Sequence, residues 1–332
     1  MWLLTNRTRF AAERTFLRDA NGAEVLVVAI KATFALDPAG RLELMEQQQP
    51  IERVPRYRGD PQRSSLLCET DFVLCKAATD VLLLGSAHAA GGRPSIAVEV
   101  GMRVGPLAKT AIAIGDRRWQ HDITGFHLSE PEPFASMPLT YERAFGGVDV
   151  DGDERSVHET NPVGVGYGRN VRASAPPAVP NLEDPEALLR SPEAHPPTIG
   201  FGPIARTWPT RRRLAGSYDE RWHRERRPLL PADFDPAFYQ CAPPDQRLLL
   251  RGGEGVELTG VSPDGPLRFE LPRIGLTLHT RMGGRTVDHG VMLHTVLFEP
   301  DASRVALTFA SALPCHAFVQ SLGETIVEEV AP

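Results

Sequence analysis

The chain has 332 residues, of which 42% are hydrophobic and 23% are charged, a balance typical of folded globular proteins and not of disordered ones. The formal net charge of -6 argues against a protein that coats nucleic acid, because neutralising phosphates needs a clustered positive surface. The sequence shows no signal-peptide pattern and no apolar run long enough to span a membrane, so we expect a cytoplasmic protein without a membrane partner.

The first 120 residues predict an antiparallel sheet system. Residues 23 to 36 (AEVLVVAIKATFAL) are rich in β-branched side chains and end at DPAG, a turn signal, which predicts a strand entering a hairpin. Further runs of the same kind, each bounded by glycine or proline, predict strands at residues 79 to 89, 95 to 104 and 109 to 115.

The middle of the chain has a different character. Between Pro176 and Pro244 lie 14 of the 30 prolines, which interrupt regular structure repeatedly. One short helix is expected at residues 181 to 191 (NLEDPEALLRS), where Asn181 can cap the first turn. A loop region of this length in a compact protein is either functional or unusually well packed.

After Asp245 the β pattern returns. Gly283 and Gly284 form a two-residue hairpin signal, and counting outward from this turn places His279 opposite Asp288. A second hairpin is expected to turn at residues 300 to 303 (PDAS).

Together these patterns predict a mainly β protein, with antiparallel sheets in a sandwich-like arrangement and few short helices. We expect one integrated unit with an N-terminal β region at 1–124, a loop-rich Pro/Arg/aromatic segment at 125–247 packed on the sheets, and C-terminal β hairpins at 248–332.

Asp149, Asp151 and Asp153 alternate around a glycine, as at the start of a calcium-binding loop. The EF-hand pattern fails, because glutamate stands at its sixth position (Glu154) and threonine at its twelfth (Thr160). A turn in which the aspartates bond to nearby backbone groups is the favoured interpretation, and calcium is the alternative.

Residues 206 to 227 (RTWPTRRRLAGSYDERWHRERR) contain eight arginines and three acids among aromatic side chains. The plainest interpretation is structural, with arginines paired to acids and aromatics buried under the loops. Arginine and tryptophan also anchor protein partners. Binding of single-stranded nucleic acid is the least favoured alternative.

Sites for metals and catalysis are weakly indicated. His279, His289 and His294 come nearest to a histidine cluster, but an odd step of five residues along a strand separates the last two. The four cysteines (Cys68, Cys75, Cys241 and Cys315) show no zinc-like spacing. We therefore expect no metal, no cofactor and no catalytic residues, with a carbohydrate-active hydrolase that uses a carboxylate pair, or a sugar-binding β module, as the alternative.

Six blocks occur in a recognisable order: KAATDVLLLGSA (76 to 87), LTYERAFGG (139 to 147), NPVGVGY (161 to 167), GFGPIARTWPTRRRLAGSYDERW (200 to 222), RPLLPADFDPAFYQCAPPDQ (227 to 246) and HTVLFEPDASRVALTF (294 to 309). Together they resemble a bacterial domain-of-unknown-function family associated with type VI secretion. The resemblance covers most of the chain.

The resemblance implies a non-catalytic adaptor or chaperone that binds a toxic effector protein and helps load it onto the valine-glycine-repeat spike protein. This agrees with the aromatic and arginine side chains of the loop region, which are candidates for its packing or for the surface that binds a partner. The candidate partner-binding residues are Tyr141, Phe145, Trp208, Arg211, Arg212, Arg213, Tyr218, Trp222, Phe238 and Tyr239, with Phe234 as a further packing candidate.

Overall fold

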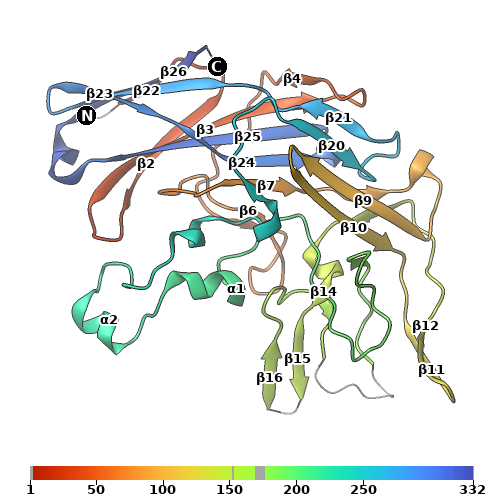
Figure 1. Cartoon of the computed structure of the whole chain (residues 1–332). Coiled ribbons are helices and arrows are strands. Elements are labelled where there is room, and N and C mark those ends of the chain that lie inside the picture. The colour runs from red at the N-terminus through yellow and green to blue at the C-terminus, as the bar shows by residue number, and fades with distance from the viewer. Residues whose placement is uncertain (1–2, 152, 169–175, 332) are drawn as a thin grey trace.

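The computed structural model describes residues 3–151, 153–168 and 176–331. The protein is mainly β, as predicted, with three larger sheets that are mostly antiparallel and that share one hydrophobic core. Figure 1 shows these sheets in the upper part of the molecule, with the loop-rich middle of the chain below them.

The largest sheet has seven strands and contains the two longest, of 13 and 11 residues. Its strands, in spatial order, are β19 (Arg247–Leu248), β7 (Thr79–Leu83), β24 (Met292–Glu299), β25 (Arg304–Pro314), β3 (Glu24–Leu36) and β2 (Ala11–Arg18), with β4 (Leu42–Leu44) also paired to β3.

Two further sheets close the core. The five-stranded sheet has the order β18 (Leu182–Glu183), β10 (Leu107–Ile114), β9 (Ala97–Val104), β20 (Gly255–Thr259) and β21 (Leu267–Glu270). The four-stranded sheet has the order β1 (Leu3–Asn6), β26 (Leu322–Val330), β22 (Gly275–Met282) and β23 (Arg285–Gly290).

Strand β3 lies inside the largest sheet, and both of its faces are buried. Leu26 and Ile30 belong to the main core, whereas Val25 and Val27 pack in a second cluster with Phe72. Since successive side chains of a strand point to opposite faces, a strand covered on both sides needs the unbroken apolar run that β3 has.

The sheets are mostly antiparallel, as predicted, but they also contain parallel pairings. Strand β7 pairs with β24 in parallel, and β1 pairs with β26 in parallel. These pairings join segments that are more than two hundred residues apart in sequence. Local turn signals cannot predict such distant partners.

Both C-terminal hairpins are confirmed. Gly283 and Gly284 have φ of 59° and 78° and connect β22 to β23, with His279 opposite Asp288 in the register. The second turn is the 3-10 helix η6 (Pro300–Ala302), and Ser303 after it has a left-handed φ of 49°. Turn chemistry is local, so the sequence specifies these registers.

The loop-rich segment is built from short ribbons and single helical turns. Its two-stranded ribbons are β11 (Trp119–Asp122) with β12 (Gly125–Leu128), β13 (Ser136–Pro138) with β8 (Ser86–His88), β14 (Phe145–Gly146) with β17 (Val165–Gly166), and β15 (Val148–Asp151) with β16 (Glu154–Val157). A further ribbon pairs β5 (Arg56–Tyr57) with β6 (Leu66–Cys68). The helical elements are α1 (Pro209–Arg212), α2 (Glu220–Glu225), η2 (Tyr141–Arg143), η3 (Arg213–Ala215), η4 (Pro236–Tyr239) and η5 (Pro244–Gln246), with η1 (Ala90–Gly92) and η7 (His316–Ser321) elsewhere.

The helix expected at residues 181 to 191 is wrong. This stretch begins as β18, and the Asn181 side chain donates to the carbonyl of Ile114 at 3.0 Å instead of capping a helix. Glu183 is drawn inward, where it pairs with the guanidinium of Arg117 and accepts the backbone N–H of Leu189 at 2.7 Å. Tertiary pairing of a buried carboxylate overrides the weak helical preference of this stretch.

Within the described part of the chain no helix is long and apolar enough to cross a membrane.

The shared core makes a direct prediction. Phe298 on β24 is 0% exposed, and replacing it with alanine leaves a cavity between sheets. We expect Phe298→Ala to lower the free energy of unfolding by about 3–5 kcal/mol. Leu249→Ala is the matched control, because Leu249 is 71% exposed and its truncation changes little. Urea unfolding followed by fluorescence measures both, and equal losses in the two variants would contradict a common core at β24.

Candidate functional site

All three lysines of the chain are buried, whereas arginines supply the positive charge of the surface. Each lysine forms an ion pair with one aspartate. The pairs are Lys31 with Asp71 at 2.5 Å, Lys76 with Asp80 at 2.7 Å and Lys109 with Asp245 at 2.9 Å. No motif in the sequence indicates these pairs, although the scarcity of lysine beside abundant arginine is a signal that the few lysines have special positions.

Asp80 on β7 is the centre of the most deeply buried of these groups. Besides Lys76, its carboxylate accepts the backbone N–H of Cys241 at 2.9 Å, and the Gln240 side chain lies within 3.4 Å. Burial alone would raise the pKa of Asp80, but the charge of Lys76 and the backbone hydrogen bonds lower it overall. This carboxylate therefore stays ionised and fixes residues 240 to 242 on the sheet.

A second buried centre forms around Glu69. Its Oε2 lies 2.6 Å from Arg211 Nη1 and 3.0 Å from Arg206 Nε. Arg211 also donates to the carbonyls of Phe238 and Ile204, at 2.9 and 2.8 Å. The carboxylate thus gathers α1 and η4 against the segment that follows β6.

Four of the predicted partner-binding residues lie below the surface. Tyr141, Phe145, Trp208 and Arg211 are all buried, with Trp208 2% exposed. Tyr141 and Trp208 stack edge to face with centroids 4.9 Å apart, and the Tyr141 hydroxyl donates to the carbonyl of Gly202 at 3.0 Å. These four side chains therefore pack beneath the surface and are not exposed for contact with a partner.

Tyr141 also explains a glycine in the loop. A Cβ on Gly200 would lie 2.4 Å from Cε1 of the Tyr141 ring, so the backbone passes where a side chain has no room. Glycine at this position lets the segment after Pro197 pack closely against the Tyr141 ring.

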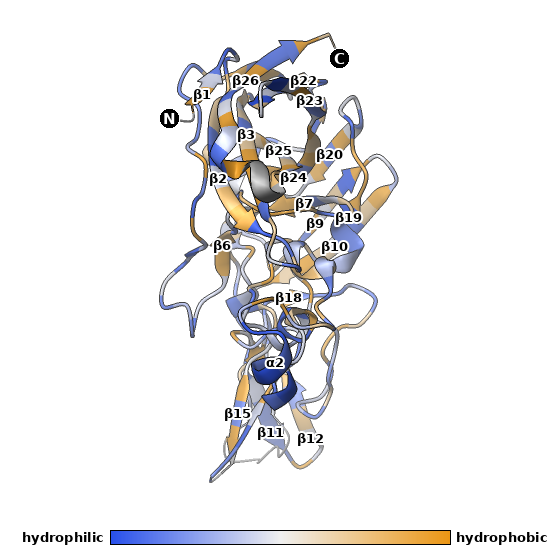
Figure 2. Ribbon diagram, turned by 90° about the vertical axis from the view of Figure 1, so that its left-hand side faces the viewer, coloured by the Kyte–Doolittle hydropathy of each residue, from blue (hydrophilic) through white to orange (hydrophobic). Residues whose placement is uncertain are grey.

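The exposed candidates lie on a projecting segment, residues 214 to 235, which we call the arm. The backbone N–H of Asp235 donates to the carbonyl of Leu214 at 2.9 Å, and Asp233 accepts the backbone N–H and the hydroxyl of Ser217 at 2.9 and 2.8 Å. These bonds close the arm at its base. Figure 1 shows the arm, with α2, extending away from the sheets, and Figure 2 shows α2 as a hydrophilic element below them.

Tyr218 and Trp222 form an aromatic pair on the arm. Their ring centroids are 4.8 Å apart in an edge-to-face arrangement, and Tyr218 is 53% exposed. Trp222 is half-buried, and its Nε1 donates to the carbonyl of Leu229 at 2.8 Å. Asp219 caps α2 by accepting the backbone N–H of Trp222 at 2.8 Å. The pair is thus fixed in place and accessible.

A second aromatic cluster lies at the foot of the arm. Phe234, Phe238 and Tyr239 are half-buried and touch one another with centroids 5.5 to 6.3 Å apart. The guanidinium carbon of Arg211 lies 5.4 Å from the Phe238 ring centroid. Burial raises the pKa of the Tyr239 hydroxyl to about 12, so this residue is neutral at the surface.

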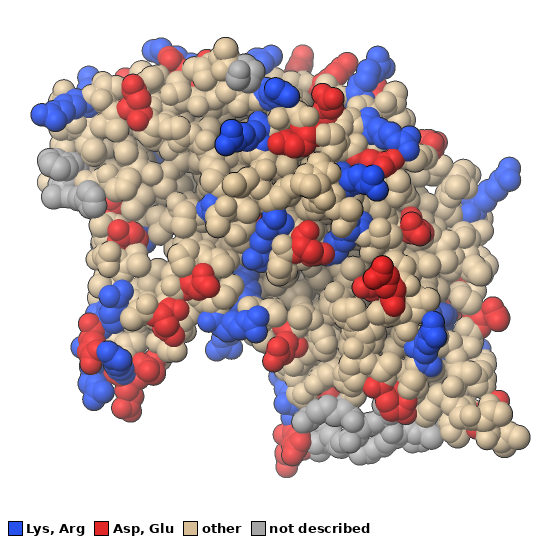
Figure 3. Space-filling model, in the orientation of Figure 1, with Lys and Arg blue, Asp and Glu red and all other residues tan. Residues whose placement is uncertain are grey.

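The arm and its base expose arginines without ion-pair partners among the described residues. Arg212, Arg213, Arg224 and Arg227 are exposed and form no such pair in the described ranges. Figure 3 shows a notch between the lobe with α2 and the lobe with β15 and β16, with basic groups at its upper end.

A cavity of about 630 Å³ lies at the base of the arm. It is lined by loops that precede and follow the arm in the chain, and by Lys109 near the start of β10. Most of its wall is apolar. The lining residues are Lys109, Tyr141, Thr160, Asp184, Pro197, Thr198, Ile199, Gly200, Ile204, Thr210, Arg211, Arg213, Leu214, Ala237, Pro243, Pro244, Asp245 and Arg247.

The charged groups of this cavity are mostly satisfied within the protein. Burial lowers the pKa of Lys109, partly offset by Asp245, and the Lys109 ammonium also donates to Gln246 Oε1 at 2.8 Å. Arg247 donates to the carbonyl of Ala242 at 2.6 Å. Arg213 is the exception, because it is exposed and has no ion pair within the described residues.

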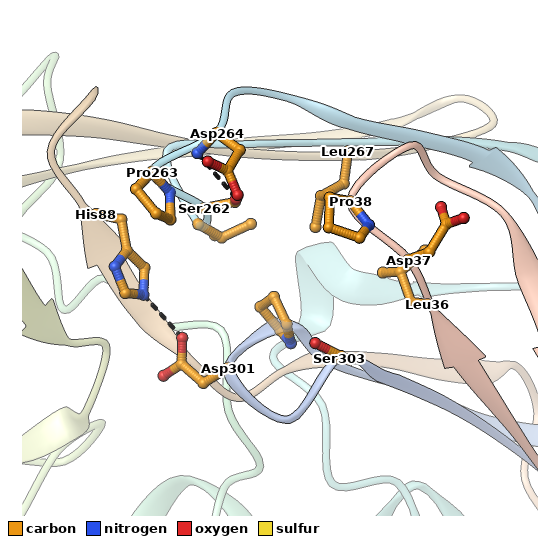
Figure 4. A pocket seen from close by; sticks show the side chains of 12 residues that line it. Leu36, Asp37, Pro38, His88, Ser262, Pro263, Asp264, Leu267, Asp301 and Ser303 are labelled. Atoms are coloured by element: carbon orange, nitrogen blue, oxygen red, sulfur yellow. Dashed lines mark hydrogen bonds and ion pairs between the residues drawn. The ribbon is translucent and has the colours of Figure 1, made fainter. Parts of the chain in front are cut away.

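A smaller cavity of about 300 Å³ lies between η6, the turn after β3 and the loop that connects β20 to β21 (Figure 4). At its edge His88 Nε2 lies 2.9 Å from Asp301 Oδ1, and the Ser86 hydroxyl donates to Asp301 Oδ2 at 2.8 Å. Asp37 pairs with Arg41 at 2.8 Å. Asp301 thus holds β8 against η6.

The histidines of the C-terminal hairpins do not cluster. His279 Nδ1 lies 2.6 Å from Asp288 Oδ1, which confirms the predicted cross-strand pair. His289 and His294 lie on β23 and β24, which belong to different sheets, so the expected separation has a different cause from alternation along one strand. His289 is held between the hydroxyls of Thr280 and Ser311, at 2.8 and 2.7 Å.

The aspartates at residues 149 to 153 lie on the β15–β16 hairpin, in which Asp149 is opposite Ser156. The side chain of Asp151 and residue 152 lie outside the described residues, so the favoured turn with side-chain to backbone bonds stays a prediction and calcium stays its alternative. Elsewhere in the described ranges, no three His, Cys, Asp or Glu side chains are grouped as metal ligands.

Comparison with known proteins identifies one family. The family model described as an uncharacterized protein conserved in bacteria (DUF2169) matches residues 21–310. No match was found among curated proteins or among solved structures.

Burial of His294 predicts a pH dependence of stability. Its burial, with the nearby charge of Lys76, lowers the pKa from 6.5 to about 3. Between these two pKa values, His294 is protonated in the unfolded chain and neutral in the folded protein. Stability is full above pH 6.5 and falls as the pH drops towards 3, by about 1.4 kcal/mol per pH unit for this group.

We expect His294→Leu to flatten this dependence in urea unfolding between pH 6.5 and 4, leaving the smaller contribution of His289, whose pKa is lowered to about 4. His121→Gln, an exposed histidine, is the control and keeps the slope of the unmodified protein. An unchanged slope in His294→Leu would show that His294 is protonated in the folded state.

Proposed function

Because the chain belongs to the DUF2169 family of uncharacterized proteins conserved in bacteria, we propose that it works by binding other polypeptides without catalysis. The specific role that we propose is a cytoplasmic adaptor or chaperone of type VI secretion. In this role it binds a toxic effector protein and helps load it onto the valine-glycine-repeat spike protein.

The observation that supports this proposal is the arm. Tyr218 and Trp222 are presented together on a segment that projects from the sheets, and the bonds at its base hold it in one conformation. Aromatic and arginine side chains contribute most of the binding energy in many protein interfaces. A surface that is already ordered loses little entropy on binding, which leaves more of that energy for affinity.

Four of the five acids of the arm serve its own structure, and Glu220 is the fifth. Asp219 caps α2, Asp233 bonds to Ser217, and Glu225 pairs with Arg221 at 3.0 Å. Asp235 accepts the backbone N–H of Ala237 at 2.8 Å. Since these carboxylates are engaged internally, the exposed arginines are available to a partner, and an acidic polypeptide surface is the matching chemistry.

The alternative predicted from the sequence, a carbohydrate-active hydrolase or sugar-binding module, would use the smaller cavity, whose wall contains Asp37, Asp264 and Asp301 (Figure 4). A carboxylate pair across a sugar ring is the usual requirement for glycoside hydrolysis. Release of reducing sugar by the purified protein, lost in Asp264→Asn, would favour this alternative over the adaptor.

We expect Trp222→Ala to reduce recovery of the effector and of the spike protein about tenfold or more in affinity purification from the native bacterium, quantified by mass spectrometry. Trp222 lies on the arm and outside the hydrophobic core, so the melting temperature should shift little. Ile123→Ala is the control, because Ile123 is exposed at the end of a distant ribbon, and recovery should not change.

Two outcomes would contradict the proposal. If Trp222→Ala unfolds the protein, Trp222 is a structural residue and not a contact. If the unmodified protein recovers neither an effector nor a spike component, the adaptor role is wrong.

A further inference from the structure

We propose that the cavity of about 630 Å³ at the base of the arm is a receptor pocket for a short segment of the bound polypeptide, in which a large apolar side chain enters the cavity and an adjacent carboxylate pairs with Arg213. This inference rests on the proposed protein-binding function. It adds the location of the pocket and the chemistry of the segment recognised there.

The shape and chemistry of the wall select an apolar occupant. Ile199, Ile204 and Leu214 contribute aliphatic surface, and Pro243 and Pro244 contribute rigid rings. The volume falls within the range of roughly 300–1,000 Å³ that is typical of pockets for small ligands. A Trp, Phe or Leu side chain transferred from water into such a wall gains the free energy of apolar burial.

The charges at the cavity select a negative neighbour for that side chain. Lys109 is neutralised by Asp245, and the guanidinium of Arg247 is bonded to the carbonyl of Ala242. The second acid, Asp184, accepts the backbone N–H of Glu186 at 3.0 Å. Arg213 then remains as an exposed cation in the wall without an ion pair among the described residues, and Arg212 beside it is exposed as well.

The cavity is held open by groups that are bonded elsewhere. The Thr198 hydroxyl donates to the carbonyl of Phe145 at 2.9 Å, and that of Thr210 donates to the carbonyl of Glu159 at 3.2 Å. Arg211 is fixed by Glu69, and its Nη2 has no hydrogen-bond partner among the described atoms. A wall organised in this way needs little rearrangement when a segment enters.

The pocket and the arm are neighbours in the chain and in space. Leu214 lines the cavity and is also the residue whose carbonyl closes the base of the arm with Asp235. Ala237, two residues beyond Asp235, lines the cavity from η4. A polypeptide that follows the arm to its base therefore reaches the pocket.

The test uses the full chain and the peptide Gly-Asp-Trp-Asp-Gly-amide, labelled with fluorescein on its N-terminal amine, with fluorescence polarisation as the readout. Two comparison peptides replace Trp by Ala or both Asp by Lys. We expect saturable binding of the first peptide, with Kd raised about tenfold for the Ala peptide. Binding should weaken as salt is increased, because the contact with Arg213 is exposed.

Two variants locate the binding. Ala237→Phe fills the cavity and should raise Kd about tenfold or more, whereas Ala108→Phe, an exposed position on β10 outside the cavity, should not. Arg213→Glu should raise Kd about fivefold, whereas Arg285→Glu, an exposed arginine on β23, should not. Circular dichroism and thermal melting check that each variant is folded.

Absence of binding, or equal binding by Ala237→Phe and Ala108→Phe, overturns the pocket. If the peptide fails while the effector is still recovered through Trp222, only the pocket is wrong and the adaptor function stands. If the peptide binds as expected while no effector or spike protein is recovered, the pocket stands and the secretion role is wrong.

Discussion

The architecture depends on one buried carboxylate, that of Asp80. It lies fully buried on β7, between β19 and β24 in the largest sheet. Lys76 neutralises it and also donates to the Thr295 hydroxyl at 3.0 Å, while the backbone of Cys241 binds the same carboxylate. Removing one partner from a buried ion pair leaves the other charge uncompensated, at a cost of about 3–5 kcal/mol. The sheet and the loop-rich segment are therefore stabilised as one unit.

The hydrogen bonds around Asp80 are linked to the wall of the cavity at the base of the arm. Residues 240 to 242 are fixed on β7, and Gln246 shortly after them donates to the carbonyls of Val81 and Phe201, at 2.7 and 3.0 Å. The same Gln246 accepts from Lys109, which pairs with Asp245 in the cavity wall. Long proline-rich loops usually lack such order, because little ties their backbone down. Here buried polar side chains replace the ladder hydrogen bonds of a sheet, so the loops keep a defined cavity.

The sequence specified the features that depend on neighbours along the chain. The apolar run of β3, the Gly283-Gly284 hairpin and the His279–Asp288 pair all follow from alternation and turn chemistry. The parallel β7–β24 pairing did not, because it joins segments about two hundred residues apart. The predicted helix after Asn181 failed for the same reason, since Arg117 lies far away in sequence.

The candidate site was also predicted only in part. Composition identified the arginines and aromatics of residues 206 to 227, but it contains no information on which of them face solvent. Trp208 and Trp222 are both preceded by polar residues, yet the first packs on Tyr141 and the second lies on the arm. Exposure is decided by what covers a residue, and the covering segments come from elsewhere in the chain. The cavity could not be predicted at all, because its wall is assembled from stretches between residues 109 and 247.

Lysine and arginine have different positions in this protein, with the lysines buried in the framework and most arginines at the surface. A lysine ammonium is a compact charge that one aspartate and one or two neutral acceptors can satisfy inside a protein, as Lys76 and Lys109 show. A guanidinium has five donors, and even the well-coordinated Arg211 leaves one nitrogen without a partner among the described atoms. Arginine therefore needs more acceptors than lysine inside a protein, but, being weakly hydrated, it is the easier cation to desolvate against a carboxylate of another molecule. With its lysines engaged internally, the protein meets its surroundings with guanidinium groups, and Arg213 presents one of them at the mouth of a preformed apolar cavity.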